Sequence, residues 1–160
     1  MVQLAAARMH DQPLRPLALR SFRLAQPTDV LVVEEDPSLV EVLARHFRAA
    51  GFRVRAAADG LRALFEVERR RPDLIVLDLS LPVMSGFRLV QLLKREATTS
   101  DVPVLVLTAL SFQEAKEAVQ AGVDDFLMRP VPPPEVVSRA RQLLDRARQR
   151  QPARAAAPAA

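Results

Sequence analysis

Short apolar runs recur along the middle of the chain and alternate with segments of helical periodicity. The most hydrophobic run, at residues 74–77, consists of branched side chains with no polar position. A continuous run of this kind is typical of a strand that is buried on both faces of a parallel sheet. Similar runs predict further strands at 29–33, 52–57, 102–107 and 123–128, of which the strand at 52–57 is the weakest.

Between these strands, apolar residues recur at every third or fourth position, which predicts amphipathic helices. Leu39, Leu43 and Phe47 mark the first helix, and Gly51 closes it. The inward residues expected on the four later helices are Ala63, Leu64 and Val67; Leu89, Leu92 and Leu93; Ala115, Ala118 and Val119; and Val136, Val137, Ala140, Leu143 and Leu144.

The alternation of five strands with five helices defines the fold class. Each connection is long enough for a right-handed crossover from one strand to the next. The chain is therefore predicted to be an α/β protein, a (βα)5 three-layer sandwich with a parallel five-stranded sheet between two layers of helices. In such sheets, functional residues lie at the carboxyl ends of the strands.

The two ends of the chain differ in composition from this central part. Residues 1–28 contain four arginines, one aspartate and three prolines without regular periodicity, and residues 149–160 are rich in Ala, Pro and Arg. We expect 1–28 to be a disordered basic extension, 29–148 to be the folded domain, and 149–160 to be a disordered tail.

Charge and composition exclude several classes of function. The formal net charge is +4, but residues 29–149 hold 17 basic and 18 acidic side chains, so the surplus lies in the ends. A folded basic face for nucleic acid is therefore not expected. The absence of cysteine excludes disulfides, thiolate metal sites and cysteine nucleophiles. No apolar stretch is long enough to span a membrane, and we expect a soluble, cytoplasmic protein.

Polar side chains stand where the predicted strands end. Glu34 and Glu35 follow the first strand, Asp78 the third, Thr108 the fourth and Arg129 the fifth. A carboxylate at the end of a buried strand is costly unless something neutralises it. Taken alone, Asp78 could simply cap the loop that follows it. The other end-of-strand residues favour a functional site.

Together, these residues resemble the receiver domain of bacterial two-component response regulators, the CheY-like superfamily. The resemblance covers about 29–148. It rests on the acidic pair, on Asp78 followed by Leu-Pro and a glycine, on Thr108 followed by Ala, and on Arg129 before a proline. It implies the strand order 2-1-3-4-5 in the sheet.

The resemblance also implies roles for individual residues. Asp78 would accept a phosphoryl group from a histidine kinase or phosphotransfer protein, as a step of a phosphorelay. Thr108 would hydrogen-bond a phosphoryl oxygen, and Arg129 would supply positive charge. Phe126 matches the family's aromatic switch position, although it also suits a plain core aromatic on the fifth strand.

A divalent cation is implied at the same place. Carboxylates about 5 Å apart repel each other by roughly 3 kcal/mol at an effective dielectric constant of 20, so they need a cation. Oxygen ligands and a phosphoryl substrate point to Mg²⁺. By the resemblance, Glu35, Asp78 and the backbone carbonyl of Ser80 would bind the ion directly, and Glu34 would bind it through a water.

Two departures from the family pattern leave an alternative open. The family usually has Lys at the position of Arg129 and at least one Asp in the acidic pair. Our first hypothesis is a stand-alone receiver, without enzymatic activity, that signals by protein binding through its fourth helix, fifth strand and fifth helix. The alternative is a degenerate receiver that acts as a scaffold without phosphorylation. A phosphohydrolase of the haloacid dehalogenase type is disfavoured, because Ser80 stands where a second Asp is needed.

Overall fold

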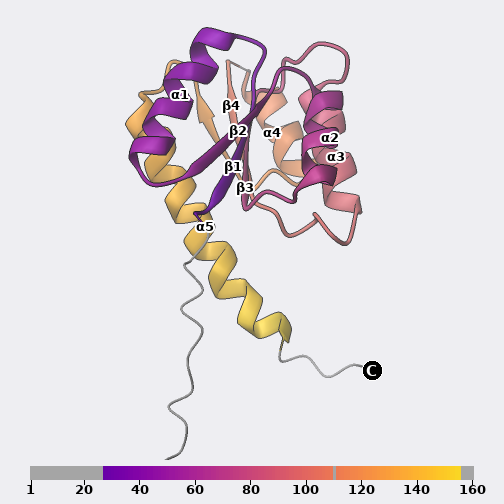
Figure 1. Cartoon of the computed structure of the whole chain (residues 1–160). Helices are drawn as coiled ribbons and strands as arrows, with labels where there is room; N and C mark the ends of the chain where they lie inside the picture. The colour runs from indigo at the N-terminus through magenta and orange to yellow at the C-terminus, as the bar shows by residue number, and fades with distance from the viewer. Residues whose placement is uncertain (1–26, 110, 156–160) are drawn as a thin grey trace, which may run out of the picture.

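The computed structural model describes residues 27–109 and 111–155, which form a parallel sheet covered by helices on both faces (Figure 1). The strands are β1 (Asp29–Val33), β2 (Arg53–Ala57), β3 (Leu74–Leu77), β4 (Val104–Thr108) and β5 (Asp125–Met128). The helices are α1 (Pro37–Ala49), α2 (Gly60–Arg69), α3 (Gly86–Arg95), α4 (Phe112–Gln120) and α5 (Pro133–Ala155).

The sheet has the order β2-β1-β3-β4-β5, and every pairing is parallel. This confirms the predicted fold class and strand order. β1 and β3 lie in the middle of the sheet, and all their residues are buried. Their continuous apolar sequence follows from this position, since both faces of each strand are covered.

Alternate residues of the central strands enter two separate cores. On one face, Leu31, Val33, Ile75 and Leu77 pack with residues of α2, α3 and α4. On the other face, side chains including Val76 pack with α1 and α5. Because successive side chains of a strand point to opposite faces, one apolar run supplies both cores.

The helices begin at residues with suitable capping side chains. Asp36 caps α1, as its position in the sequence suggests, and its Oδ1 accepts a hydrogen bond of 2.9 Å from the amide of Ser38. Asp59 and Ser85 cap α2 and α3 in the same way. These caps fix where each loop at the carboxyl edge of the sheet ends.

The structure differs from the sequence expectations in two helices. Val119 was expected to face inward but is 54% exposed, because α4 contacts the core through Ala118 and Ala121 instead. The side chain of Ala115 lies outside the described part. The tail expected from residue 149 is helical as far as Ala155, since Arg, Gln and Ala are good helix formers that prolong α5. The expected extension at 1–28 lies, apart from its last two residues, outside the described residues.

Within residues 27–109 and 111–155, no helix combines the length and the hydrophobicity that crossing a membrane requires.

Candidate functional site

The carboxyl ends of four strands bring the candidate residues to one edge of the sheet. Backbone hydrogen bonds prolong the sheet by one residue here: the amide of Asp78 donates to Val33 at 3.0 Å, and that of Arg129 donates to Thr108 at 2.9 Å. Glu34 is held likewise, through its amide, by Ala57. The side chains therefore start from a rigid backbone.

Arg129 bridges two buried carboxylates. Its Nη1 lies 3.1 Å from Oδ2 of Asp78, and its Nη2 bonds Oε2 of Glu34. Glu34 and Asp78 are only 4% and 8% exposed. The guanidinium thus supplies the positive charge that two buried carboxylates need. Glu34, Asp78 and Arg129, which the sequence predicted at one site, are in contact.

The remaining carboxylate oxygens accept hydrogen bonds from nearby backbone amides. Oε1 of Glu34 accepts from the amide of Asp36, and Oδ1 of Asp78 accepts from the amide of Ser80, each at 3.0 Å. Each oxygen of the two carboxylates therefore has a protein donor, and both side chains are fixed in orientation.

Glu35 does not join this cluster. Its side chain is exposed, whereas Glu34, one residue earlier, is buried. In the part of the chain that the structure describes, no group of three or more His, Cys, Asp or Glu side chains is placed to hold a metal ion. Glu34 and Asp78 nevertheless fit Mg²⁺ by donor chemistry, since this ion takes one or two carboxylates together with waters. In this structure the Arg129 guanidinium lies between the two carboxylates.

Thr108 contributes a buried hydroxyl group without a partner. It is 1% exposed, and its Oγ1 has no hydrogen-bond partner among the described residues. Phe126 of β5 pairs with Val106, which lies two residues before Thr108 in β4. Its side chain is half-buried against the core beneath α2, α3 and α4. The peptide bond between Arg129 and Pro130 is cis.

The loop after β3 approaches the site more closely than the sequence predicts. A Cβ on Gly86 would lie 2.5 Å from the carbonyl oxygen of Asp78, so only glycine lets α3 begin against the end of β3. Within the loop, Val83 has a φ of 63° and the amide of Met84 donates to Pro82 at 2.6 Å. The glycine eight residues after Asp78 was the available signal, but its contact depends on how the loop folds back.

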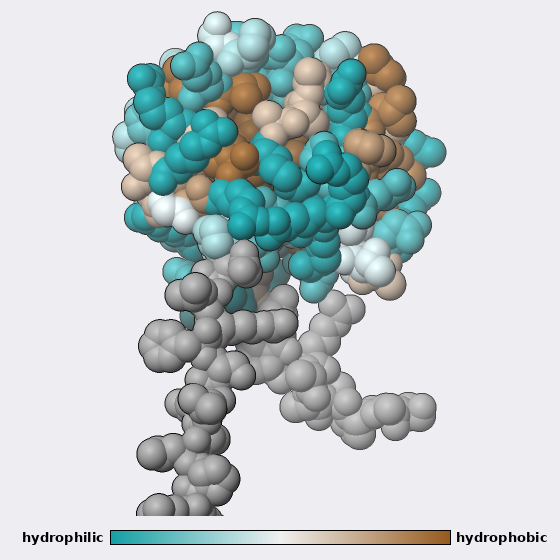
Figure 2. Space-filling view, in the orientation of Figure 1, coloured by the Kyte–Doolittle hydropathy of each residue, from teal (hydrophilic) through white to brown (hydrophobic). Residues whose placement is uncertain are grey.

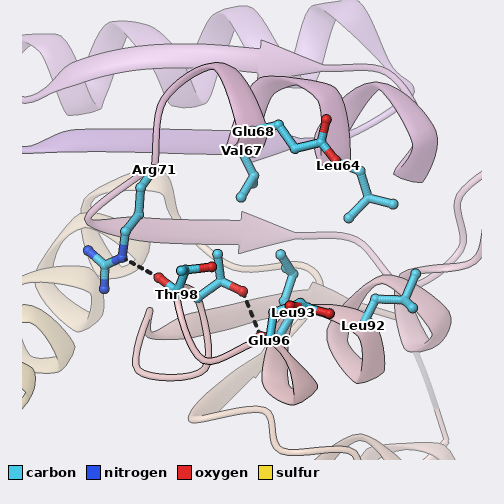
Figure 3. A pocket seen from close by; sticks show the side chains of 9 residues that line it. Leu64, Val67, Glu68, Arg71, Leu92, Leu93, Glu96 and Thr98 are labelled. Carbon is cyan, nitrogen blue, oxygen red and sulfur yellow. Dashed lines mark hydrogen bonds between the residues drawn. The ribbon is translucent and has the colours of Figure 1, made fainter.

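A groove of about 470 Å³ lies away from this site, between α2 and α3. Figure 3 shows Leu64 and Val67 of α2 facing Leu92 and Leu93 of α3 across it. Arg71 donates to the carbonyl of Thr98 and also to Asp101, each at 2.8 Å. Because the Arg71 guanidinium is already paired, it is not free to bind a ligand in the groove.

Comparison with known proteins identifies the family. Residues 30–141 match the response regulator receiver domain, and this chain belongs to that family, the receiver domain of two-component response regulators. The matched range includes all five strands except Asp29, the first residue of β1, and it includes the positions of Glu34, Asp78, Thr108 and Arg129.

Two curated relatives indicate the range of similarity. The DNA-binding regulator RpaA of Synechocystis sp. is 37% identical over 118 residues, which are 73% of this chain and 49% of RpaA. The transcriptional regulatory protein PrrA of Mycobacterium tuberculosis is 42% identical over 118 residues, with 73% and 50% covered. The chain therefore spans about half the length of the curated relatives it matches.

Among solved structures, the receiver domain of the sensor histidine kinase PA1611 from Pseudomonas aeruginosa PAO1 is 31% identical, with a TM-score of 0.69. The match covers 74% of this chain and 98% of that domain, which holds a magnesium ion in its active-site cleft.

Proposed function

We propose that this chain is a phosphorylation-controlled receiver of a phosphorelay, in which Asp78 accepts the phosphoryl group and the output is protein binding. The observation that carries this proposal is the buried hydroxyl of Thr108, which has no partner among the described residues. An unpaired buried donor is costly. A phosphoryl oxygen bound beside Asp78, at the end of the neighbouring strand β3, would satisfy it.

The chemistry requires little more than position and charge. A carboxylate oxygen of Asp78 attacks the phosphorus of a phosphohistidine donor and forms an acyl phosphate. The P–N bond breaks, and its electron pair returns to the imidazole nitrogen of the donor. Arg129 then exchanges the Asp78 carboxylate for the phosphoryl oxygens, which a guanidinium can bind bidentately. Phosphoryl transfer relies mainly on such positioning and electrostatic stabilisation.

Glu34 and Asp78 would hold Mg²⁺, with the backbone carbonyl of Ser80 as a third ligand. When bound, the ion would neutralise charge on the carboxylates and the phosphoryl oxygens. Glu35, which the family resemblance implies as a direct ligand, would have to turn inward from its exposed position. We therefore propose Glu34 rather than Glu35 as the first acidic ligand.

The proposed partners are a histidine kinase or phosphotransfer protein and a downstream protein. The α4–β5–α5 face is the proposed downstream surface, with Phe126 as the switch residue. Val119 on α4 and Met128 on β5 are 54% and 44% exposed, which supports an apolar contact there. We propose a cytoplasmic location and no direct contact with nucleic acid from this domain.

Acetyl phosphate tests the acceptor. With Mg²⁺ present, it should add one phosphate to the wild-type chain and none to Asp78→Asn, as measured by intact mass. Asp145→Asn, which changes an exposed aspartate on α5, is the matched control and should be labelled like the wild type. Labelling that persists in Asp78→Asn would move the acceptor elsewhere.

One observation favours a second function, that of a scaffold independent of phosphorylation. Arg129 already bridges Glu34 and Asp78, so a permanent ion pair would substitute for the metal. A Mg²⁺ titration of the wild type and Arg129→Ala, followed by amide chemical shifts, separates the two functions. Binding in the wild type that weakens or stays level in Arg129→Ala supports the receiver. Binding only in Arg129→Ala supports the scaffold.

A further inference from the structure

Three large apolar side chains lie exposed along α2 and the loop after β3. Leu61 and Phe65 are 56% and 61% exposed and lie one helical turn apart, and Val83 is 82% exposed. The loop packs against the start of α2, because a Cβ on Gly60 would lie 2.6 Å from the carbonyl oxygen of Met84. We call Leu61 and Phe65 the α2 stripe. Figure 2 shows hydrophobic surface on the side of the molecule where α2 and α3 lie.

The charges beside the α2 stripe are unequal on its two sides. Arg62, Arg69 and Glu66 line a groove of about 440 Å³ toward β2, together with Leu61 and Phe65. The Glu66 side chain is only 19% exposed and pairs with Arg55 and Arg69, so the exposed charge on this side is basic. Glu68 lies on the other side, in the groove between α2 and α3. The stripe is therefore apolar in the middle and basic along the side that faces β2.

Arg62 and Arg69 are both exposed, although Arg69 is already paired with Glu66. Within 27–109 and 111–155, Arg62 forms no ion pair with a carboxylate. Arg69 pairs with Glu66 at 3.1 Å, but its side chain is 64% exposed. Its guanidinium carbon lies 6.0 Å from the centre of the Phe65 ring, so covering that ring would also shield the cation from water. A carboxylate placed there would gain from the lower local dielectric.

We propose that the α2 stripe binds an amphipathic helix of a partner protein. Its apolar side chains would cover Leu61 and Phe65, and acidic side chains on one flank would lie along Arg62 and Arg69. An apolar groove with a charged rim is how helices are recognised in other proteins. This surface is distinct from the α4–β5–α5 face, and the proposal does not depend on phosphorylation of Asp78.

Two other occupants fit the charges less well. A second copy of the chain, placed with two-fold symmetry, would bring the same arginines close to each other. The segment 1–28 has four arginines and one aspartate, so it lacks the acidic flank that Arg62 and Arg69 require.

The test uses the full chain and designed helical peptides. One peptide carries leucines at i, i+3, i+4 and i+7 with glutamates along one flank, and its twin carries lysines in place of the glutamates. We expect the glutamate peptide alone to shift the amide signals of Leu61 and Phe65. Phe65→Asp should weaken its binding by at least about tenfold, as expected for a central aromatic contact. Arg45→Asp, at an exposed position of α1, should leave the affinity unchanged.

Reversing one charge on the protein tests the electrostatic part of the proposal. Arg62→Glu should reduce affinity for the glutamate peptide and raise it for the lysine peptide. Leu61→Ser serves as a second variant if Phe65→Asp lowers the thermal midpoint. Equal binding of both peptides, or shifts confined to α4 and β5, would overturn the proposal. Self-association of the wild type that Phe65→Asp abolishes would do the same, in favour of a second copy.

Discussion

Each end of the sheet has an arginine against a buried carboxylate, but the two arginines are held differently. At the amino end, Arg55 donates from Nε and Nη2 to Oδ2 of Asp29, at 3.0 and 2.7 Å. It also donates to Oε2 and the backbone carbonyl of Glu66, and to the carbonyl of Arg70. All three nitrogens are used, although Oδ1 of Asp29 has no partner among the described residues.

At the carboxyl end, the guanidinium of Arg129 bonds, among the described residues, only to the carboxylates of Glu34 and Asp78. No backbone carbonyl in the described part holds its guanidinium. Arg55 is therefore fixed by the fold itself, whereas Arg129 is held only by groups that a metal or a phosphoryl group would also bind. A structural arginine is therefore recognised by the further acceptors that hold its guanidinium, such as backbone carbonyls, more than by its ion pair. An arginine without them can exchange partners.

Arg55 keeps its positive charge because its pKa is raised. Burial lowers its pKa, but the hydrogen bonds that it donates to Asp29 and Glu66 outweigh this and raise the pKa above its ordinary value. A raised pKa means that the cation's contribution to stability is complete below the ordinary pKa of arginine. It is lost only when the pH rises through the still higher folded value. Across the working range of pH, this arginine does not act as a switch.

The largest effect is expected from Arg55→Ala. It removes both short hydrogen bonds to Asp29, which is 1% exposed, and leaves that carboxylate with the Arg70 Nε at 3.9 Å, so we expect a loss of about 3–5 kcal/mol in the free energy of unfolding. Urea denaturation measures this. Arg148→Ala removes an exposed pair with Asp145 and should cost less than about 1 kcal/mol. Equal, small losses in both variants would contradict the structural role of Arg55.

Arg129→Ala should lower the free energy of unfolding by less than Arg55→Ala does, and Mg²⁺ should recover part of the loss. Loss of the guanidinium leaves Glu34 and Asp78 without their cation, but each carboxylate keeps its backbone amide donor, so we expect a loss of about 1–3 kcal/mol in the free energy of unfolding. Added Mg²⁺ should recover part of it, because a ligand that binds only the folded state stabilises it. The thermal midpoint with and without Mg²⁺ is the measurement. A loss as large as that of Arg55→Ala, unchanged by Mg²⁺, would remove the distinction between the two arginines.

Two buried threonines allow a matched comparison in which the expected changes in the free energy of unfolding are smaller. The Thr99 hydroxyl donates to the carbonyl of Leu93 at 2.8 Å, so Thr99→Val should cost about 1 kcal/mol. The Thr108 hydroxyl has no such partner. Thr108→Val should therefore leave the free energy of unfolding unchanged or slightly higher, while it impairs phosphorylation by acetyl phosphate. A destabilised Thr108→Val would mean that the hydroxyl already has a structural partner.

The smallest effect is expected from deleting residues 1–26. These residues carry surplus charge without apolar periodicity. Thr28, whose Oγ1 accepts a hydrogen bond from Arg148, would remain. The thermal midpoint should stay within experimental error of the wild type. A marked decrease would show that the extension packs on the domain and would place a further contact near the amino end of the sheet.

Much of the site could be predicted because position along a strand determines position at the edge of the sheet. Asp78, Thr108 and Arg129 each follow or end an apolar run, so their proximity follows from the parallel topology. The pattern could not decide between Glu34 and Glu35. Neighbouring residues leave a strand in opposite directions, and only the structure shows which one is buried.

Long-range pairs could not be predicted either. The contact between Asp29 and Arg55 spans 26 residues and depends on the register that sets Leu31 opposite Arg55. Val119 was misplaced for a related reason, because helical periodicity fixes which residues share a face but not how deeply a small helix packs. In both cases the missing information is the distance between elements.

The length of α5 has a consequence for how the domain melts. The helix has 23 residues, about 34 Å at 1.5 Å per residue, but its last buried side chain among the described residues is Leu144. Its later turns extend beyond the sheet (Figure 1). Short helical segments without packing are marginal in water, and Pro152 offers no amide hydrogen to bond. Amide exchange along α5 should therefore quicken stepwise toward its end, so that this helix frays from its tip inward while the sheet is still intact.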